Sequence, residues 1–164
     1  MNGLKQEPLG FFVSLALAVA PVLAAGMLGS LATLPAIPEW YVTIRKPWFT
    51  PPNWIFGPVW SVLYTIMAYT FFRLLRQPAP RGRGWVITAF MVQIAANAAW
   101  SVAFFGGRSP TLGMVVIVPL CLSVAWTLVL FWKRDKVAGG LMAPYLAWVL
   151  FAGALNFEIW RLNL

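Results

Sequence analysis

The side chains that could perform chemistry in this 164-residue sequence are mainly aromatic. Trp60 and Tyr64 lie four residues apart, and Gln93, Asn97 and Trp100 follow at intervals of four and three, so each set occupies one face of a helix. Ligand sites of this type are largely apolar and carry a few polar groups that orient the bound molecule. The spacing predicts an aromatic binding pocket that holds its ligand by stacking and burial.

Conventional catalytic groups are scarce. The sequence has no histidine and one cysteine, Cys121, so we expect no imidazole base, no disulfide within the chain and no thiolate metal cluster. The acidic residues are Glu7, Glu39, Asp135 and Glu158. Glu158 precedes Arg161 by three residues, a spacing that predicts a surface ion pair. We therefore predict no metal, no cofactor and no catalytic residue of the usual kinds.

The elements that must position these residues follow from the charges. Only 10% of residues are charged, compared with about 25% in soluble domains. Five charge-free runs each reach the length of about 20 residues that a spanning helix needs, namely 8–38, 47–72, 84–107, 109–132 and 137–157. We predict an all-α membrane protein, a single five-transmembrane-helix bundle over residues 1–164, with helices at about 9–31, 52–76, 84–105, 110–132 and 138–160.

Orientation follows from the lysines and arginines that flank these helices. Eight lie on the side of the N-terminus and four on the other side, which predicts a cytoplasmic N-terminus and contact with anionic headgroups of membrane lipids.

A nucleic-acid partner is excluded because no basic soluble domain remains. The first run is too long for a cleaved signal, whose apolar core has about 7–15 residues. We expect a multi-pass protein of the bacterial inner membrane.

The segment 40–60 contains four tryptophans and four prolines and joins the first two predicted helices. Its rigidity predicts that residues of about 32–51 form a lid over the pocket, with Arg45 and Lys46 at the edge. The two cations suit an amphipathic anion, although contact with lipid headgroups would also explain them. Ordinary interhelical packing remains an alternative for the buried residues, which we place in the outer half of the bilayer: Trp60, Tyr64, Asn97, Trp100 and Asn156.

Three spaced motifs resemble a known family. The first contains Lys46-Pro47-Trp48, Pro51-Pro52 and Val59-Trp60, the second is the set around Gln93, and the third contains Pro144-Tyr145-Leu146 and Leu155-Asn156-Phe157. Together they resemble the translocator protein family, also called tryptophan-rich sensory proteins or peripheral-type benzodiazepine receptors. The resemblance implies a five-helix bundle, often a homodimer. It implies binding of porphyrins such as protoporphyrin IX, of sterols such as cholesterol, and of isoquinoline or benzodiazepine ligands.

The resemblance also implies particular site residues. The ligand-binding set that it carries over is Tyr41, Trp48, Pro51, Phe56, Trp60, Tyr64, Asn97, Trp100, Trp148, Ala152 and Leu155. The sterol pattern of animal members falls on Leu155, Phe157 and Arg161, but Phe157 stands where those members have tyrosine. This departure weakens the expectation of sterol binding.

Three functions follow as hypotheses. The first is a tetrapyrrole-binding translocator or sensor. The second is an enzyme that degrades porphyrin with light and oxygen, through Trp60 and Trp148. The third is a small multidrug or ion transporter, which is disfavoured because no charge lies at the bilayer midplane. Small residues predict two possible dimer faces, Ala95-Ala99-Ala103 and Gly26-Ser30.

Overall fold

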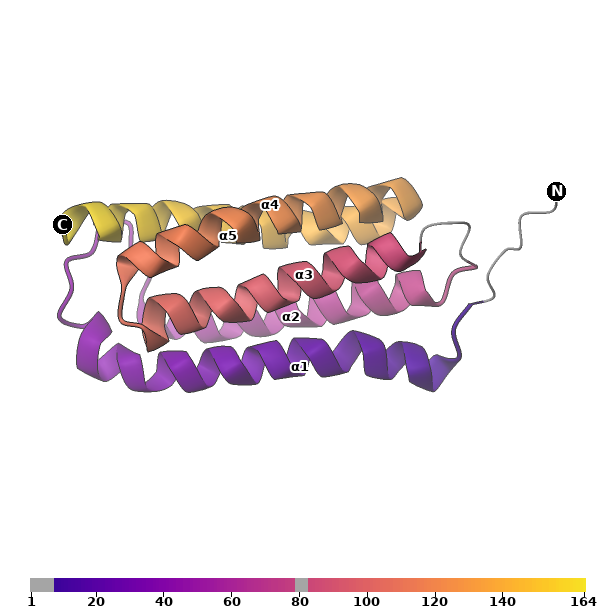
Figure 1. Ribbon diagram of the computed structural model, residues 1–164, viewed down its shortest axis with the longest axis horizontal. Coiled ribbons are helices and arrows are strands. Elements are labelled where there is room, and N and C mark those ends of the chain that lie inside the picture. Colours follow the sequence, from indigo (N-terminus) through magenta and orange to yellow (C-terminus); the bar gives the residue numbers. More distant parts are fainter. Residues whose placement is uncertain (1–7, 79–82) are drawn as a thin grey trace.

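The computed structural model describes residues 8–78 and 83–164 and contains five long helices. Each is long and apolar enough to cross a membrane, which confirms the predicted five-helix membrane fold. Figure 1 shows them as an elongated antiparallel bundle. We call its right-hand end in that view, where the first helix begins, the N end, and the opposite end the C end. The helices are α1 (Phe11–Ala36), α2 (Asn53–Leu75), α3 (Arg83–Ser101), α4 (Pro110–Arg134) and α5 (Lys136–Leu162).

The first helix is longer than the charge pattern predicted. It continues beyond residue 31 to Ala36 and then into a π-helical turn, η1 (Ile37–Tyr41), so the connection to α2 comprises only residues 42–52. A proline has no backbone N–H and therefore removes one hydrogen bond between residues i and i−4 of an α-helix. A π-helical turn has a different pattern, with hydrogen bonds between residues five apart. Here Pro35 and Pro38 lie at this transition without ending the helix. A second π-helical turn, η2 (Val102–Gly106), extends α3.

Capping residues set the start of the two C-terminal helices. Ser109 precedes α4, and its hydroxyl accepts a hydrogen bond from the N–H of Leu112 at 3.2 Å. Pro110 occupies the first helical position. The backbone N–H at that position makes no hydrogen bond within the helix, so a proline there costs none. Asp135 separates α4 from α5 by a single residue. The predicted boundaries of both helices are therefore correct to within two residues.

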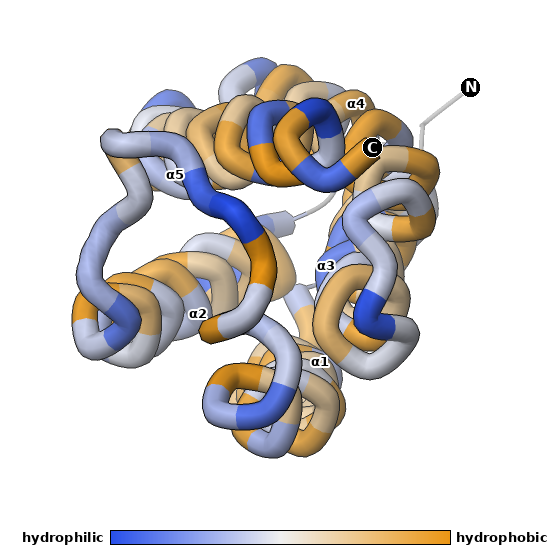
Figure 2. The backbone as a smooth tube through the Cα atoms, turned by 90° about the vertical axis from the view of Figure 1, so that its left-hand side faces the viewer, coloured by the Kyte–Doolittle hydropathy of each residue, from blue (hydrophilic) through white to orange (hydrophobic). Residues whose placement is uncertain are grey.

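The helices form a ring in the order α1, α2, α5, α4, α3, which the contact between α1 and α3 closes. Figure 2 looks along this ring from the C end. Three phenylalanines from α2, α3 and α4 fill its interior near the N end: Phe71 stacks on Phe90 at 3.9 Å between ring centroids, and Phe131 lies 6.4 Å from Phe90. All three are fully buried, so the ring has a solid centre at this level.

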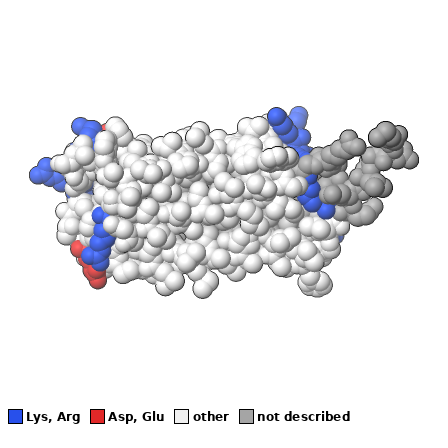
Figure 3. Space-filling view, in the orientation of Figure 1, with Lys and Arg blue, Asp and Glu red and all other residues white. Residues whose placement is uncertain are grey.

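Charged side chains gather at the two ends of the bundle, and the long middle section is uncharged on the face that Figure 3 shows. At the C end, Glu39 pairs with Arg108, and Glu158 pairs with Arg161 at 2.7 Å as the spacing predicted. Lys5 and Arg81, which contributed to the predicted orientation, lie outside the described residues. This separation of charge is what a chain that crosses a bilayer requires.

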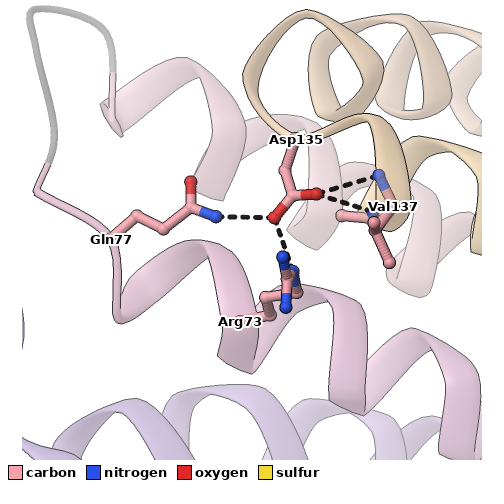
Figure 4. A network of polar contacts seen from close by, with 5 residues as sticks. Arg73, Gln77, Asp135 and Val137 are labelled. Carbon is pink, nitrogen blue, oxygen red and sulfur yellow. Dashed lines mark hydrogen bonds and ion pairs between the residues drawn. The ribbon is translucent and has the colours of Figure 1, made fainter.

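Asp135 holds α2 and α5 together at the N end (Figure 4). One carboxylate oxygen accepts hydrogen bonds from the N–H groups of Val137 and Ala138, which caps α5. The other accepts from Arg73 Nε, in the last turn of α2, at 2.5 Å and from Gln77 Nε2, two residues beyond that helix, at 2.6 Å. Burial of the carboxyl group raises its pKa, but these four hydrogen bonds outweigh that effect, and the net result is a lowered pKa for Asp135.

Two substitutions at this position separate the charge from the cap. Asp135→Asn retains an amide oxygen that can cap α5 but removes the charge that binds Arg73, so we expect a loss of about 1 kcal/mol of stability. Asp135→Ala removes both functions and should cost about 2 kcal/mol. Thermal unfolding in detergent measures the difference, at about 2–4 °C for each kcal/mol. Glu158→Gln, which breaks an exposed ion pair at the C end, serves as the control and should change little.

The pH dependence has a defined sign. Because the pKa of Asp135 is lowered in the folded protein, its contribution is complete above the ordinary value of 3.8 and is lost as the pH falls below it. The stability difference between the parent and Asp135→Asn should therefore shrink in acid. An unchanged difference at pH 7 and pH 3 would contradict this account of the carboxylate.

Candidate functional site

A cavity of about 460 Å³ lies inside the ring at the C end. Side chains from α1, α2, α3, α5 and both π-helical turns line it. Its volume lies within the range of about 300–1,000 Å³ that is common for small-molecule sites. Eight of the eleven predicted ligand-binding residues line this one cavity: Tyr41, Phe56, Trp60, Tyr64, Trp100, Trp148, Ala152 and Leu155.

The other three predicted residues lie elsewhere. The side chain of Trp48 is 95% exposed and does not line the cavity, because the loop carries it outward from the bundle. Pro51 is half-buried just before α2 and does not line the cavity either. Asn97 is buried one layer below, behind Tyr64. The sequence shows that these residues belong to the same region, but not which side chains face inward.

A continuous chain of hydrogen bonds forms the floor of the cavity. Tyr64 donates to Asn97 Oδ1 at 2.8 Å, Asn97 Nδ2 donates to the Tyr145 hydroxyl at 3.1 Å, and that hydroxyl donates to Gln93 Oε1 at 3.0 Å. We call these four residues the polar belt. It joins α2, α3 and α5 across the interior of the ring. Because Tyr64 lines the cavity and is also part of the belt, the belt fixes the position of the cavity floor.

The wall formed by α3 depends on a second polar contact. Trp100 Nε1 donates to Asn156 Oδ1 at 3.1 Å, and Asn156 Nδ2 donates to the carbonyl of Pro110 at 2.9 Å. Gly113 permits this arrangement, since a Cβ atom there would lie 2.5 Å from Asn156 Oδ1 and 2.6 Å from the Phe104 ring. The indole N–H of Trp100 is therefore committed to the protein.

The indole N–H of Trp148 is different. Trp148 lines the cavity, and its Nε1 atom is buried without a hydrogen-bond partner in the part of the chain that the structure describes. The ring is held by Phe56 at 5.9 Å and Phe151 at 5.5 Å between centroids. A buried donor of this kind is costly unless a partner satisfies it. This N–H is thus a buried donor beside the cavity that the described residues leave unsatisfied.

The loop at residues 42–52 lies over the end of α5. Arg45 and Asn163 exchange backbone and side-chain hydrogen bonds at 3.0 and 2.9 Å, and the Phe49 ring contacts that of Phe151 at 6.3 Å. None of these eleven loop residues, all of which the structure describes, lines the cavity. Lys46 does reach its wall, because the ammonium group lies 4.8 Å from the centre of the Tyr41 ring.

The exposed part of the cavity wall lies on α1 and α2 only. The lining residues of α3, η2 and α5 are buried or half-buried, whereas the exposed ones lie on the facing halves of the first two helices: Ser30, Leu34, Asn53, Trp54, Gly57 and Ser61. The cavity therefore opens sideways between α1 and α2. Four of these six residues, Ser30, Leu34, Gly57 and Ser61, lie inside segments that are long and apolar enough to span the membrane, whereas Asn53 and Trp54 are the first two residues of α2.

Sequence reasoning missed the contribution of α1. It placed Gly26 and Ser30 on a dimer face, which stays a prediction. Both residues also line the cavity, and a Cβ atom on Gly26 would lie 3.2 Å from the Tyr64 ring of the same chain. Gly29 lines it as well. The cluster of small residues is the signal that could have identified a surface that approaches another helix closely. The other predicted face is open, since Ala95 and Ala99 are exposed and Ala103 is half-buried.

The sterol pattern does not form one surface. Leu155 is buried and faces the cavity, while Phe157 is 44% exposed on another face of α5. Arg161 is paired with Glu158. The three residues share a helix but not a direction.

A multi-pass integral membrane protein with a laterally open aromatic cavity is thus the class that the fold and the site define. Comparison with known proteins identifies the family: the model of the TspO/MBR family matches residues 17–161, and the chain belongs to that family. The tryptophan-rich protein TspO of Archaeoglobus fulgidus is 38% identical over 92% of this chain and 97% of its own length. Protein CrtK of Rhodobacter capsulatus is 40% identical, covering 92% and 95%. The human translocator protein is 33% identical, covering 76% and 75%.

The polar belt makes a prediction about stability. Tyr145→Phe breaks two hydrogen bonds of the belt, and Tyr64→Phe breaks one. Hydrogen bonds between membrane helices average about 0.6 kcal/mol, so we expect losses of about 1.2 and about 0.6 kcal/mol, measured by thermal unfolding in detergent. Thr65→Val removes an exposed hydroxyl that bonds within its own helix and is the control. Equal losses for the two tyrosines would contradict the central place of Tyr145.

Proposed function

We propose that this protein binds tetrapyrroles in the cavity at the C end and acts as a translocator or sensor for them. The observation that carries the proposal is an aromatic cavity whose wall includes Trp148, the indole N–H of which is buried without a hydrogen-bond partner among the described residues. A porphyrin is a flat, largely apolar ring with polar groups at its edge. Such a ring can stack on the aromatic walls while an edge group accepts the free hydrogen bond.

The charges near the cavity support an anionic ligand. Lys46 lies over the Tyr41 ring at the cavity wall, and Arg45 directly precedes it in the loop. Carboxylates on a bound ring would gain from a cation at this position. Membership in a family whose relatives are named translocator protein and tryptophan-rich sensory protein agrees with both proposed roles.

The absence of histidine from the sequence determines how the ring would be held. Without an imidazole, we expect stacking and burial, rather than coordination to a central iron, to supply most of the affinity. We therefore expect metal-free protoporphyrin IX to bind at least as tightly as haem. Titrating the purified protein with each compound and following the absorption band of the ring tests this expectation. Markedly tighter binding of haem would contradict it.

Substitutions at two cavity tryptophans test the location of the site. Trp60→Ala and Trp148→Ala each remove a ring from the wall, and each should weaken protoporphyrin IX binding about tenfold. Trp148→Phe retains a ring but removes the N–H, and should weaken binding about fivefold, as expected for one lost hydrogen bond. Trp85→Phe is the matched control, because Trp85 is 64% exposed near the N end and does not line the cavity. Binding that both alanine variants leave unchanged would place the site elsewhere.

A second function is favoured by the surroundings of Trp60. Its ring lies 5.4 Å from Tyr64 and 6.4 Å from Tyr145, so three readily oxidised rings are in contact beside the cavity. Light absorbed by a bound porphyrin could then drive oxidation of the macrocycle, with molecular oxygen as the oxidant that is reduced. Illuminating the aerobic complex should bleach the porphyrin faster than in free solution, and Trp60→Phe should slow the bleaching. A rate equal to that of free porphyrin would remove this alternative and leave binding intact.

A further inference from the structure

The end of α5 is hydrogen-bonded to the loop between η1 and α2. The side-chain amide of Asn163 accepts a hydrogen bond from the N–H of Arg45 at 3.0 Å and donates one to the carbonyl of the same residue at 2.9 Å. The two residues are 118 positions apart in the sequence. We call this pair of hydrogen bonds the C-terminal clasp. Because one amide meets both backbone groups of one residue, the clasp sets the position and the direction of the loop at Arg45.

The C-terminal clasp is anchored on α5. Asn163 Nδ2 also donates to the carbonyl of Ile159 at 2.7 Å, one turn back in the helix, and the side chain of Ile159 is buried. A second contact between the loop and α5 joins the rings of Phe49 and Phe151 at 6.3 Å between centroids. The loop is therefore held to α5 on both sides of Lys46.

Lys46 is the charged group that this arrangement positions at the cavity. It directly follows Arg45, and its ammonium group lies 4.8 Å from the centre of the Tyr41 ring, which lines the cavity. The same ammonium group donates a hydrogen bond to the carbonyl of Ile44 at 3.1 Å, within the loop. The place of this charge thus depends on the backbone of the loop, and the C-terminal clasp holds that backbone.

No acidic side chain of the described residues forms an ion pair with Lys46. At the C end, Glu39 pairs with Arg108, and Glu158 pairs with Arg161. An ammonium group has three N–H donors, and that of Lys46 uses one of them within the loop. Two donors therefore remain for a ligand that carries an acceptor beside Tyr41.

We propose that Asn163 is a positioning residue that holds Lys46 over Tyr41 and so makes the site prefer ligands with a carboxylate at their edge. The choice of ligand rests on the proposed function. A lysine on a free loop would lose the freedom of that loop on binding, and this loss would offset much of the attraction to a carboxylate. The C-terminal clasp orders the backbone before the ligand arrives. Removing the clasp should therefore weaken the effect of the charge, although the charge itself remains.

The experiment compares two ligands that share one ring. Protoporphyrin IX carries carboxylates, whereas its dimethyl ester does not, so the ratio of their dissociation constants measures the preference for the charged edge. We expect the full-length parent protein to bind the acid more tightly than the ester. Lys46→Gln should lower this preference about fivefold and Asn163→Ala about threefold, each with little change in binding of the ester. A merely structural defect would instead weaken binding of both compounds alike.

A double variant tests whether Asn163 acts through Lys46. In Lys46→Gln/Asn163→Ala, the preference should equal that of Lys46→Gln alone, because the clasp then has no charge to position. The matched control is Thr43→Val, which removes a hydrogen bond to the Trp40 carbonyl near the same loop but leaves the C-terminal clasp intact. This variant should change the preference less than twofold.

Hydrogen–deuterium exchange tests the C-terminal clasp without any ligand. The amide of Arg45, which Asn163 protects in the parent, should exchange severalfold faster in Asn163→Ala. Unchanged exchange, or an unchanged preference in Asn163→Ala when Lys46→Gln has lost it, would overturn the proposal. Equal binding of acid and ester by the parent would also overturn it but would leave the proposed function intact. Binding of neither compound would overturn the proposed function together with the preference.

Discussion

The hydrocarbon of a membrane offers no hydrogen-bond partner, and the interior of this bundle is arranged around that constraint. Gln93, Asn97 and Tyr145 are almost completely buried, and each finds its partners within the polar belt. The belt fixes α2, α3 and α5 relative to one another, because their polar groups would be unsatisfied in any other register. Tyr64 is the member of the belt that reaches the cavity, and Gly26 of α1 packs against its ring. The position of α1 thus also depends on the belt.

The belt and the phenylalanine stack divide the interior into separate compartments. The aromatic cavity lies on the C-end side. A second cavity of about 410 Å³, lined by the ends of α2 and α4 and the beginning of α3, lies on the N-end side, and buried side chains occupy the layers between the two. A molecule in the cavity cannot reach the N end through the centre of the ring unless it displaces Tyr145 and Phe71. Movement of a ligand across the membrane by this chain would therefore require either a rearrangement of the helices or a path along the outside of the bundle.

The sequence predicted the elements well because each span is bounded by charges that cannot enter the bilayer. It also predicted that Trp60, Tyr64 and Trp100 belong together, since helical spacing places them on inward faces at similar depth. It could not show how the faces are arranged around the ring. The role of Gly29 depends on α1 being the neighbour of both α2 and α3, which no local pattern reveals. The outward direction of Trp48 depends on a loop whose contacts with α5 are tertiary.

The lateral opening gives the proposed ligand an orientation. The exposed wall between α1 and α2 lies largely within the spanning segments, so its surroundings are lipid rather than water. An apolar ring that enters from the bilayer remains in apolar surroundings throughout. Carboxylates on its edge would instead lose their hydration if they entered first, which is unfavourable. Lys46 lies at the C end of the cavity, where such carboxylates can remain near water and a cation. The geometry thus favours an amphipathic ligand that enters sideways, with its charged edge toward the C end and its ring toward Trp60.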